Sequence, residues 1–155
     1  MPKTYYKMEL TGSGLTANTP AGIALVQYCP ASHRDRIPQV YADAFGEKPW
    51  PADWDMFPEF DPAGMFVAVD SATAEPAGFV ISFKRRDFGY ISVVAVAPHI
   101  RRRGVATALL RRATDYLRAR QLAKVQIDVE ATNAPAVQAY TRFGFETIAT
   151  STDQE

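Results

Sequence analysis

The first hundred residues carry short apolar segments separated by glycine, proline and charged residues, a pattern that predicts strands more than helices. The segments that we expect to form strands are residues 4–10, 22–28, 65–69, 76–84 and 89–97. The polar run Asp70–Glu75 lies between two of these segments and indicates a hairpin. We therefore expect antiparallel strand pairs in this half of the chain.

Helical periodicity is strongest after residue 100. A weaker helix is expected over residues 34–45, with Ser32 available to cap it, and residues 54–60 are a candidate short helix. The stronger pattern covers residues 104–120, where one apolar stripe is formed by Ala106, Leu109, Leu110, Ala113 and Leu117.

The last third of the chain predicts a strand, a helix and a strand. Val125–Val129 alternates apolar and polar residues, as a strand with one buried face does. Asn133 can cap a helix that carries Pro135 in its first turn and ends at Gly144. Residues 145–150 form the last expected strand.

The junction between strand 89–97 and helix 104–120 is the most informative stretch. The strand ends at Pro98, three arginines follow, and the helix begins at Gly104. The first turn of a helix has unpaired N–H groups and a positive dipole end, and glycine leaves room where a Cβ would collide. The junction therefore predicts a phosphate-binding site. The crossover that it begins also requires strand 89–97 and strand 125–129 to be parallel.

Composition restricts the class of protein. A chain of 155 residues fits one domain, and the single cysteine, Cys29, excludes an internal disulfide and suits a reducing compartment. The absence of a signal-peptide pattern and of a membrane-length apolar stretch predicts a cytoplasmic protein with no membrane partner. His33, His99 and Cys29 lack metal-ligand spacing, and no Gly-x-Ser-x-Gly motif is present, so we expect neither a metal site nor that hydrolase chemistry.

The net charge of zero conceals an asymmetry. Residues 99–124 hold seven arginines and one lysine against one aspartate, a charge of +7, and the remainder carries −7. This division suggests an anionic ligand, but a neutral chain without a helix-turn-helix pair argues against nucleic acid. The simpler interpretation of Arg111, Arg112, Arg118 and Arg120 is a solvated helix face.

Residues 43–61 contain six carboxylates, one lysine, Trp50 and Trp54. A long loop rich in aromatic and acidic residues is typical of a binding loop, and this one would suit a cationic ligand. The alternative is that the aromatic residues cover the core while the acids face water.

Two motifs resemble a known family. Val94–Pro98 (VAVAP) followed by Arg101–Ala106 (RRRGVA) resembles the acyl-CoA-binding motif of the GNAT acetyltransferases, R/Q-x-x-G-x-G/A, with alanine as an accepted last residue. A second stretch resembles the family's other cofactor motif, through Asn133, Ala136, Tyr140, Gly144 and Phe145. Both motifs occur in the expected order, and the resemblance covers residues 76–145 well.

The resemblance implies a site for acetyl-CoA without a metal. The backbone of Arg102–Thr107 would hold the pyrophosphate, Val94–Val96 the pantetheine arm, and Tyr140 would protonate the sulfur. Asp128 stands where ribosomal-protein N-acetyltransferases of this family have a glutamate base, and its shorter side chain favours a water relay. Asp128 and Glu130 could instead pair with arginines. The implied cofactor residues are Val94, Ala95, Val96, Arg101, Arg102, Arg103, Gly104, Val105, Ala106, Thr107, Asn133 and Tyr140.

The function so implied is transfer of an acetyl group to a primary amine of a small molecule, peptide or protein, by direct attack in a ternary complex. A non-catalytic acyl-CoA sensor is the alternative, and both a monomer and a homodimer remain open. For the acceptor, which the acidic loop suggests is cationic, the candidate contacts are Trp50, Trp54, Asp55, Tyr90 and Glu130.

The implied fold is an α/β (α+β) GNAT domain over residues 1–155, with a mixed, largely antiparallel sheet of six to seven strands and about four helices. Residues 1–20 would be an N-terminal extension. The chain ends too soon after Phe145 for the two closing strands usual in the family. We therefore expect Thr4–Leu10 to pair with the C-terminal part of the sheet, in its own chain or in a dimer mate.

Overall fold

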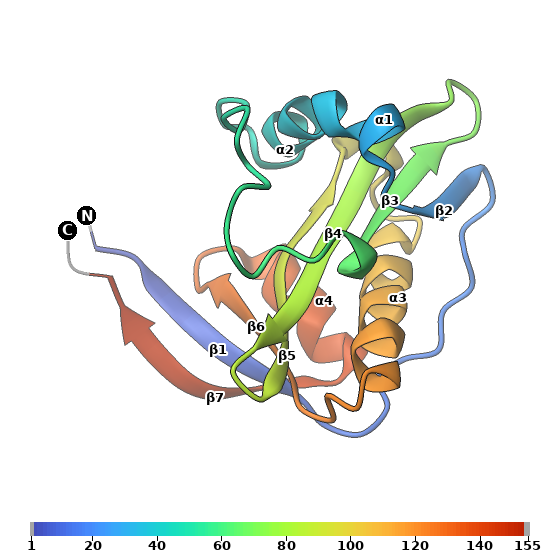
Figure 1. Ribbon diagram of the computed structural model, residues 1–155. Helices are drawn as coiled ribbons and strands as arrows, with labels where there is room; N and C mark the ends of the chain where they lie inside the picture. The colour runs from blue at the N-terminus through green and yellow to red at the C-terminus, as the bar shows by residue number, and fades with distance from the viewer. Residues whose placement is uncertain (1, 154–155) are drawn as a thin grey trace.

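The computed structural model describes residues 2–153 and contains one seven-stranded sheet, in the order β2-β3-β4-β5-β6-β1-β7 (Figure 1). The strands are β1 (Thr4–Leu10), β2 (Ile23–Gln27), β3 (Met65–Asp70), β4 (Glu75–Arg85), β5 (Phe88–Val96), β6 (Val125–Glu130) and β7 (Phe145–Thr152). The helices are α1 (Pro30–His33), α2 (Ile37–Phe45), α3 (Val105–Ala119) and α4 (Ala134–Phe143). Short 3-10 turns cover Arg34–Arg36, Pro62–Gly64 and Pro98–Ile100.

Strand pairing confirms the predicted topology. β2 to β5 form consecutive antiparallel pairs, and β5 is parallel to β6, as the crossover through α3 requires. The mixed, largely antiparallel sheet predicted from the sequence is therefore correct.

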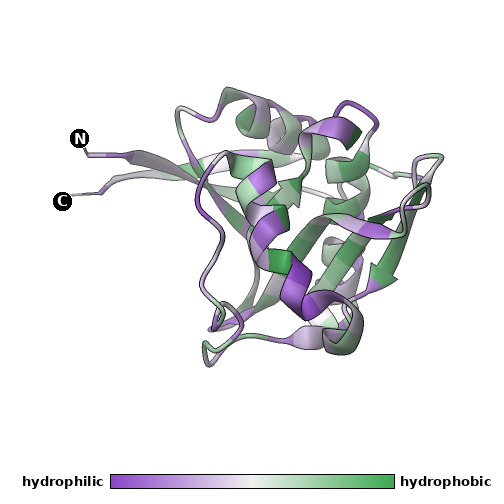
Figure 2. Ribbon diagram, turned by 90° about the horizontal axis from the view of Figure 1, so that it is seen from above, coloured by the Kyte–Doolittle hydropathy of each residue, from purple (hydrophilic) through white to green (hydrophobic). Residues whose placement is uncertain are grey.

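The sheet separates two cores. α3 and α4 cover one face, where Leu109, Leu110 and Phe143 are buried. α1, α2 and the loop that follows α2 cover the other face, where Ile37 and Phe79 are buried. Figure 2 shows hydrophobic ribbon in the strands between these layers, whereas the ends of β1 and β7 extend away from the body toward the two termini.

β1 fills the interior position that the sequence left open. It lies between β6 and β7, antiparallel to both, and buries Met8 and Leu10. The expected pairing of Thr4–Leu10 with the C-terminal part of the sheet is confirmed within the same chain. β7 is the outer strand, and after Phe145 all its residues are exposed.

The helix predicted over residues 34–45 is wrong in its first turn. Residues 34–36 form a 3-10 turn, and α2 begins at Ile37 without a side-chain cap, so Ser32 does not cap it. Pro38 in the first turn of α2 explains the break, because its ring would clash with the carbonyl of Arg34 in a continuous α-helix.

The short helix expected over residues 54–60 is also wrong. This segment forms separate turns, such as those closed by Trp54 N–H to Pro51 and Met56 N–H to Asp53. Pro58 lacks a donor in the middle of the segment, which prevents a continuous helical ladder. The loop instead ends in a 3-10 turn capped by the Asp61 side chain.

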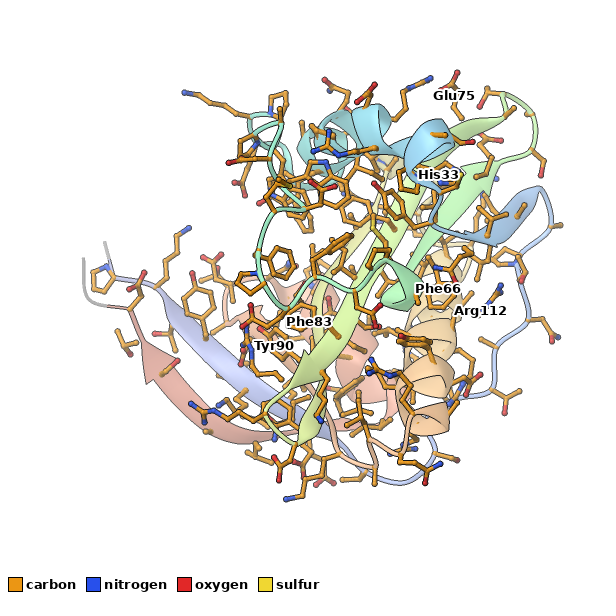
Figure 3. All side chains as sticks on the ribbon, in the orientation of Figure 1. His33, Phe66, Glu75, Phe83, Tyr90 and Arg112 are labelled. Carbon is orange, nitrogen blue, oxygen red and sulfur yellow. The ribbon has the colours of Figure 1, made fainter. Side chains whose placement is uncertain are left out.

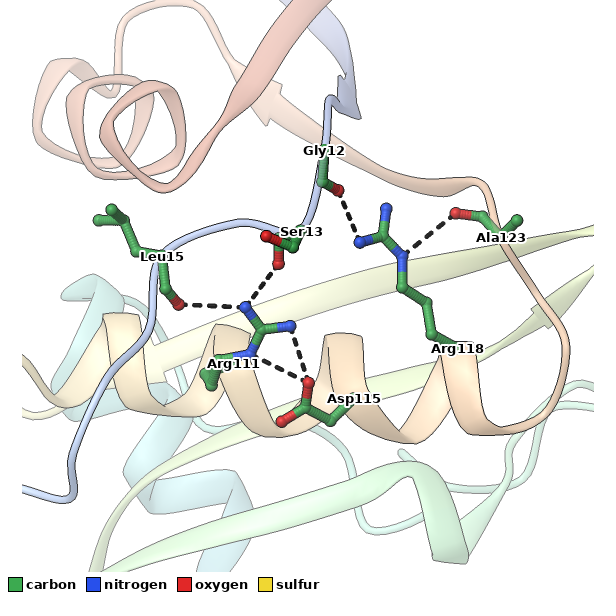
Figure 4. Close-up of polar contacts among 7 residues, drawn as sticks. All are labelled: Gly12, Ser13, Leu15, Arg111, Asp115, Arg118 and Ala123. Atoms are coloured by element: carbon green, nitrogen blue, oxygen red, sulfur yellow. Dashed lines mark hydrogen bonds and ion pairs between the residues drawn. The ribbon is translucent and has the colours of Figure 1, made fainter.

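The connection from β1 to β2 is fastened to α3 by two arginines (Figure 4). Arg111 donates to the carbonyls of Ser13 and Leu15 at 2.6 and 3.1 Å, and Arg118 donates to that of Gly12 at 2.6 Å. Arg112 lies over the Phe66 ring, and Arg120 pairs with Asp61. The prediction that these arginines form a solvated face is therefore correct only in part: Arg112 and Arg120 are exposed, but all four arginines also have partners within the protein.

Candidate functional site

The site begins where β5 and β6 separate. Along the described chain their parallel register covers only Gly89 to Ile91 of β5 and Val125 to Ile127 of β6. A shift in the pairing of β5 with β4 leaves Ser92 as an extra residue, a bulge at the point of separation. The edge of β5 over residues 94–96 therefore faces a gap in the sheet.

The turn after β5 is held in a defined shape. The Arg101 guanidinium donates to the Val96 carbonyl at 3.0 Å and to the Ala44 carbonyl at the end of α2. Arg102 has a φ of +64°, which is costly for a residue with a Cβ, and Gly104 has a φ of +86°. Two left-handed residues within three positions reverse the chain so that α3 begins beside the gap.

The first turn of α3 presents backbone donors. Gly104 is the N-cap and has no side chain to satisfy the N–H groups of the first turn, Val105 to Thr107. A Cβ built on Gly104 meets nothing within 4 Å, so the space in front of the turn is open. The positive φ, in addition to the predicted close approach of a phosphate, accounts for glycine at this position.

α4 forms the opposite wall. The Asn133 Oδ1 accepts from the Ala136 N–H at 3.3 Å and caps the helix, as predicted, and Gly144 ends it. Tyr140 lies on the inner face and is 8% exposed. Burial raises the pKa of Tyr140 from 10.0 to about 12, and at either value the phenol carries its proton near pH 7.

These elements enclose a cavity of about 920 Å³. Of the predicted cofactor residues, those that line it are Val94, Val96, Arg101, Arg102, Gly104, Val105, Ala106, Thr107, Asn133 and Tyr140, together with Glu130 from the predicted acceptor set. Ala95 and Arg103 do not line it: the Ala95 side chain is buried in the opposite core, and Arg103 is exposed and donates to the His99 carbonyl.

Sequence reasoning missed part of the lining. The end of α2 contributes Ala44, Phe45 and Glu47, and the outer part of α4 contributes Gln138 and Arg142. The two α4 residues lie four positions apart and share a helix face with each other, but each is two positions from Tyr140, so Tyr140 alone does not identify them. No local signal identifies the α2 residues, which reach the cavity only through tertiary packing.

Tyr90 and Asp128 meet on the α2 face of the sheet, beside the gap. The Tyr90 hydroxyl donates to the Asp128 carboxylate at 2.8 Å, and the Arg85 guanidinium lies 4.0 Å from the centre of the Tyr90 ring. Figure 3 shows Tyr90 next to Phe83 on this face. Burial, followed by the bond to Asp128, raises the pKa of Tyr90 to about 12. The alternative that Asp128 pairs with an arginine is not observed: among residues 2–153, the ion pairs do not include Asp128.

The remaining acceptor candidates lie elsewhere. Trp54 is buried, and Trp50 stacks between Trp54 and Tyr41, so both tryptophans belong to the core under α2. Asp55 forms a two-point ion pair with Arg34 at 2.8 Å, and this guanidinium lowers the pKa of the carboxyl. The structure thus gives these three residues internal partners and does not place them in the cavity lining.

Two further observations concern the described residues as a whole. In residues 2–153, no cluster of three or more histidine, cysteine, aspartate or glutamate side chains is arranged to hold a metal ion. The helices of this part of the chain are also too short or too polar to cross a membrane.

Comparison with known proteins identifies the family. The model of the acetyltransferase (GNAT) family matches residues 34–145. The chain therefore belongs to the GNAT acetyltransferases.

Curated relatives and solved structures agree with this assignment. A mycothiol acetyltransferase from Actinosynnema mirum is 34% identical over 154 residues, which cover 90% of this chain and 50% of the relative. Another from Saccharomonospora viridis is 30% identical over 148 residues, covering 84% and 48%. The chain thus spans about half the length of these relatives.

Similarity to solved structures concerns the fold. A GCN5-related N-acetyltransferase from Sphaerobacter thermophilus superposes with a TM-score of 0.81 at 21% identity, covering 97% of this chain and 50% of that chain. The ribosomal-protein-S18-alanine N-acetyltransferase from Escherichia coli gives 0.68 at 22% identity, covering 82% and 79%. The GNAT fold predicted from the two motifs is confirmed.

Proposed function

We propose that this protein is a cytoplasmic, acetyl-CoA-dependent N-acetyltransferase that acetylates a primary amine. The observation that carries the proposal is that a single cavity brings together the first turn of α3, the separated edge of β5 and the Tyr140 phenol. The first turn of α3 suits a phosphate group, and the free edge of β5 suits an extended arm that contains amides. The phenol suits a leaving thiolate. Membership of the GNAT family supports acetyl-CoA as the donor.

The cavity residues have distinct roles in this proposal. The backbone N–H groups at residues 102–107 bind the pyrophosphate, assisted by the positive end of the α3 dipole. The free edge of β5 at Val94–Val96 pairs with the pantetheine amides as an additional strand would. Asn133 contributes by fixing the start of α4, which holds Tyr140 over the gap.

The chemistry requires two proton transfers. The acceptor nitrogen bonds to the acetyl carbon, the C–S bond breaks, and the sulfur leaves as a thiolate. Tyr140, a buried and protonated phenol, donates its proton to that sulfur. The nitrogen loses its proton to Asp128, directly or through a water molecule.

Tyr90 supports Asp128 as the base. Its hydroxyl holds one carboxylate oxygen at 2.8 Å and leaves the other available for the amine or the water. A sensor that only binds acyl-CoA would need neither this oriented carboxylate nor a buried phenol in the cavity. The relatives' names, mycothiol acetyltransferase and ribosomal-protein-S18-alanine N-acetyltransferase, are compatible with either a small-molecule or a protein amine.

The donor site is tested with Gly104→Glu. The carboxylate would enter the open space before α3 and repel the pyrophosphate, so acetyl-CoA binding measured by calorimetry should be lost. Gly22→Glu is the matched control, because Gly22 also has a positive φ (+80°) and nothing within 4 Å of its Cβ position, but lies before β2. Normal binding by folded Gly104→Glu would show that the donor site is elsewhere.

Turnover separates the enzyme from a sensor. Wild-type protein is supplied with acetyl-CoA and a panel of tyramine, glucosamine, spermidine and a peptide with an N-terminal alanine, and thiol release is recorded. We expect at least one of these amines to be acetylated. Tight binding of acetyl-CoA without acetylation of any of them would instead favour the sensor.

A further inference from the structure

We infer that the N-terminal strand β1 forms part of the acceptor site, with the Tyr5 ring as the surface against which the body of the amine acceptor lies. The inference rests on the proposed function and adds to it a residue that contacts the acceptor. It follows from the position of β1 inside the sheet.

The strand register places Tyr5 beside the reacting groups. Tyr5 lies directly opposite Glu130, and Lys7 lies directly opposite Asp128. Opposite residues in an antiparallel pair point to the same face, with Cβ atoms about 4.5–5.5 Å apart. The Tyr5 side chain is therefore on the same face as Asp128 and adjoins Glu130, which lines the cavity.

The fold leaves the Tyr5 ring without a structural task. Tyr6, the next residue, packs against the core under α3 and α4, whereas Tyr5 belongs to neither core among the described residues. Tyr5 is only partly buried, although it lies on an interior strand. A half-exposed aromatic ring beside a carboxylate pair can contact an apolar surface and an ammonium group together.

The surrounding charges define the acceptor class. Asp128 and Glu130 lie on this face of β6, with the Tyr5 ring on the β1 side and, on the β5 side, the Tyr90 ring, over which the Arg85 guanidinium lies. The arrangement suits an amine that is cationic before reaction and is attached to a ring or another apolar body. Lys7 is the cation opposite Asp128, and its exposed side chain can turn toward solvent.

Kinetics of Tyr5→Ala test the inference with whichever panel amine the wild type acetylates fastest. We expect the KM for that amine to rise about two- to tenfold, the effect of losing one aromatic contact, with kcat and the Kd for acetyl-CoA nearly unchanged. Tyr5→Phe keeps the ring and should behave as wild type. Thr150→Ala is the matched control, because Thr150 is exposed on the same pair of strands and lies opposite Tyr6, on the other face.

A wild-type KM for the amine in Tyr5→Ala would overturn the inference. If that variant does not fold, the amide NMR signals of Thr4–Lys7 are recorded in wild-type protein with coenzyme A. These signals should shift when the amine is added, while the signal of Thr150 stays in place. Unchanged signals from β1 would overturn the inference. Failure of the wild type to acetylate any panel amine would instead overturn the proposed function, and the acceptor role of Tyr5 with it.

Discussion

The Tyr140 phenol is 8% exposed and still lines a cavity that is open to a ligand. Burial disfavours its anionic form and raises its pKa to about 12, so the phenol remains protonated well above neutral pH. A thiol has an ordinary pKa near 8.5, below that of this phenol, so complete proton transfer to a free thiolate is uphill, and the O–H first stabilises the developing charge on sulfur as a hydrogen-bond donor. Tyr140 therefore supplies one O–H donor at the place where, in the proposed reaction, the sulfur leaves.

Removing that proton should affect turnover and not binding. We expect Tyr140→Phe to lower kcat about a hundredfold or more, the usual contribution of a general acid, with little change in the Kd for acetyl-CoA. Steady-state kinetics and calorimetry measure the two quantities. Tyr41→Phe controls for the loss of a hydroxyl elsewhere, and an unchanged kcat with chemistry rate-limiting would return Tyr140 to a packing role.

Asp128 and Tyr90 should act as a unit. Asp128→Asn should lower kcat by removing the base, and Tyr90→Phe should lower kcat less, since the carboxylate is retained without its orienting bond. Because Tyr90 works through Asp128, the double variant should be no slower than Asp128→Asn alone. Additive losses in this cycle would mean that Tyr90 acts independently of Asp128.

At the scale of elements, β1 joins the last two strands to the rest of the sheet. β7 pairs only with β1 in the described chain, and β6 pairs with β5 over three residues only. The Met8 and Leu10 side chains of β1 are buried in the core between the sheet and the helices α3 and α4. One face of β1 therefore contributes side chains to the core, and its other face lies beside Asp128.

The structural contribution of β1 can be measured with one substitution. Met8 is 1% exposed, and Met8→Ala should lower the free energy of unfolding by about 2–5 kcal/mol through the cavity that it leaves. Lys7→Ala, at the exposed neighbour, should change it by less than about 0.5 kcal/mol. Urea titrations give both values, and equal midpoints for the two variants would contradict an interior β1.

Local signals explain which elements the sequence predicts well. The Asn133 cap, Gly144 and the α3 stripe act within one or two turns of chain, and the structure reproduces them. Pro38 is also a local signal, but it breaks a helix that the apolar spacing alone would continue. The position of the end of α2 in the cavity and the Tyr90–Asp128 bond depend on packing between residues 38 or more positions apart. Such contacts are absent from the periodicity of any one segment.

At the scale of the whole molecule, the basic segment at residues 99–124 is used largely within the protein. Arg111 and Arg118 donate to carbonyls of the β1–β2 connection, and Arg120 pairs with Asp61 of the loop before β3. Three of the eight basic residues of this segment therefore hold two connecting segments against α3. Arg102, which lines the cavity, is left near the proposed phosphate site, whereas the guanidinium of Arg101 is bonded to the Val96 and Ala44 carbonyls.

The buried tyrosines predict how stability depends on pH. Tyr28, Tyr90 and Tyr140 have pKa values raised to about 12, mainly by burial, against 10.0 for ordinary tyrosine. Between these two values the unfolded chain loses protons that the folded protein retains, so stability should fall as the pH rises from about 10 to 12. Urea midpoints across this range measure the fall.

Tyrosinate absorbance provides the control for this prediction. The three phenols with raised pKa values should ionise above pH 11, together with the loss of secondary structure. Tyr28→Phe should show a smaller loss of stability over this range than the wild type. Constant stability across the range would mean that the buried rings are accessible in the folded protein.

The close pairing of β1 with β7 also affects what order the elements need to have along the chain. The Asp153 N–H donates to the Lys3 carbonyl at 2.7 Å, so the outer ends of the two strands are already at the separation of a tight hairpin. A circular permutation that joined Asp153 to Lys3 and opened the chain between Thr16 and Pro20 would place β7 directly before β1. Every strand would keep its neighbours, because the sheet order is set by side-chain pattern and register and does not require β1 to come first.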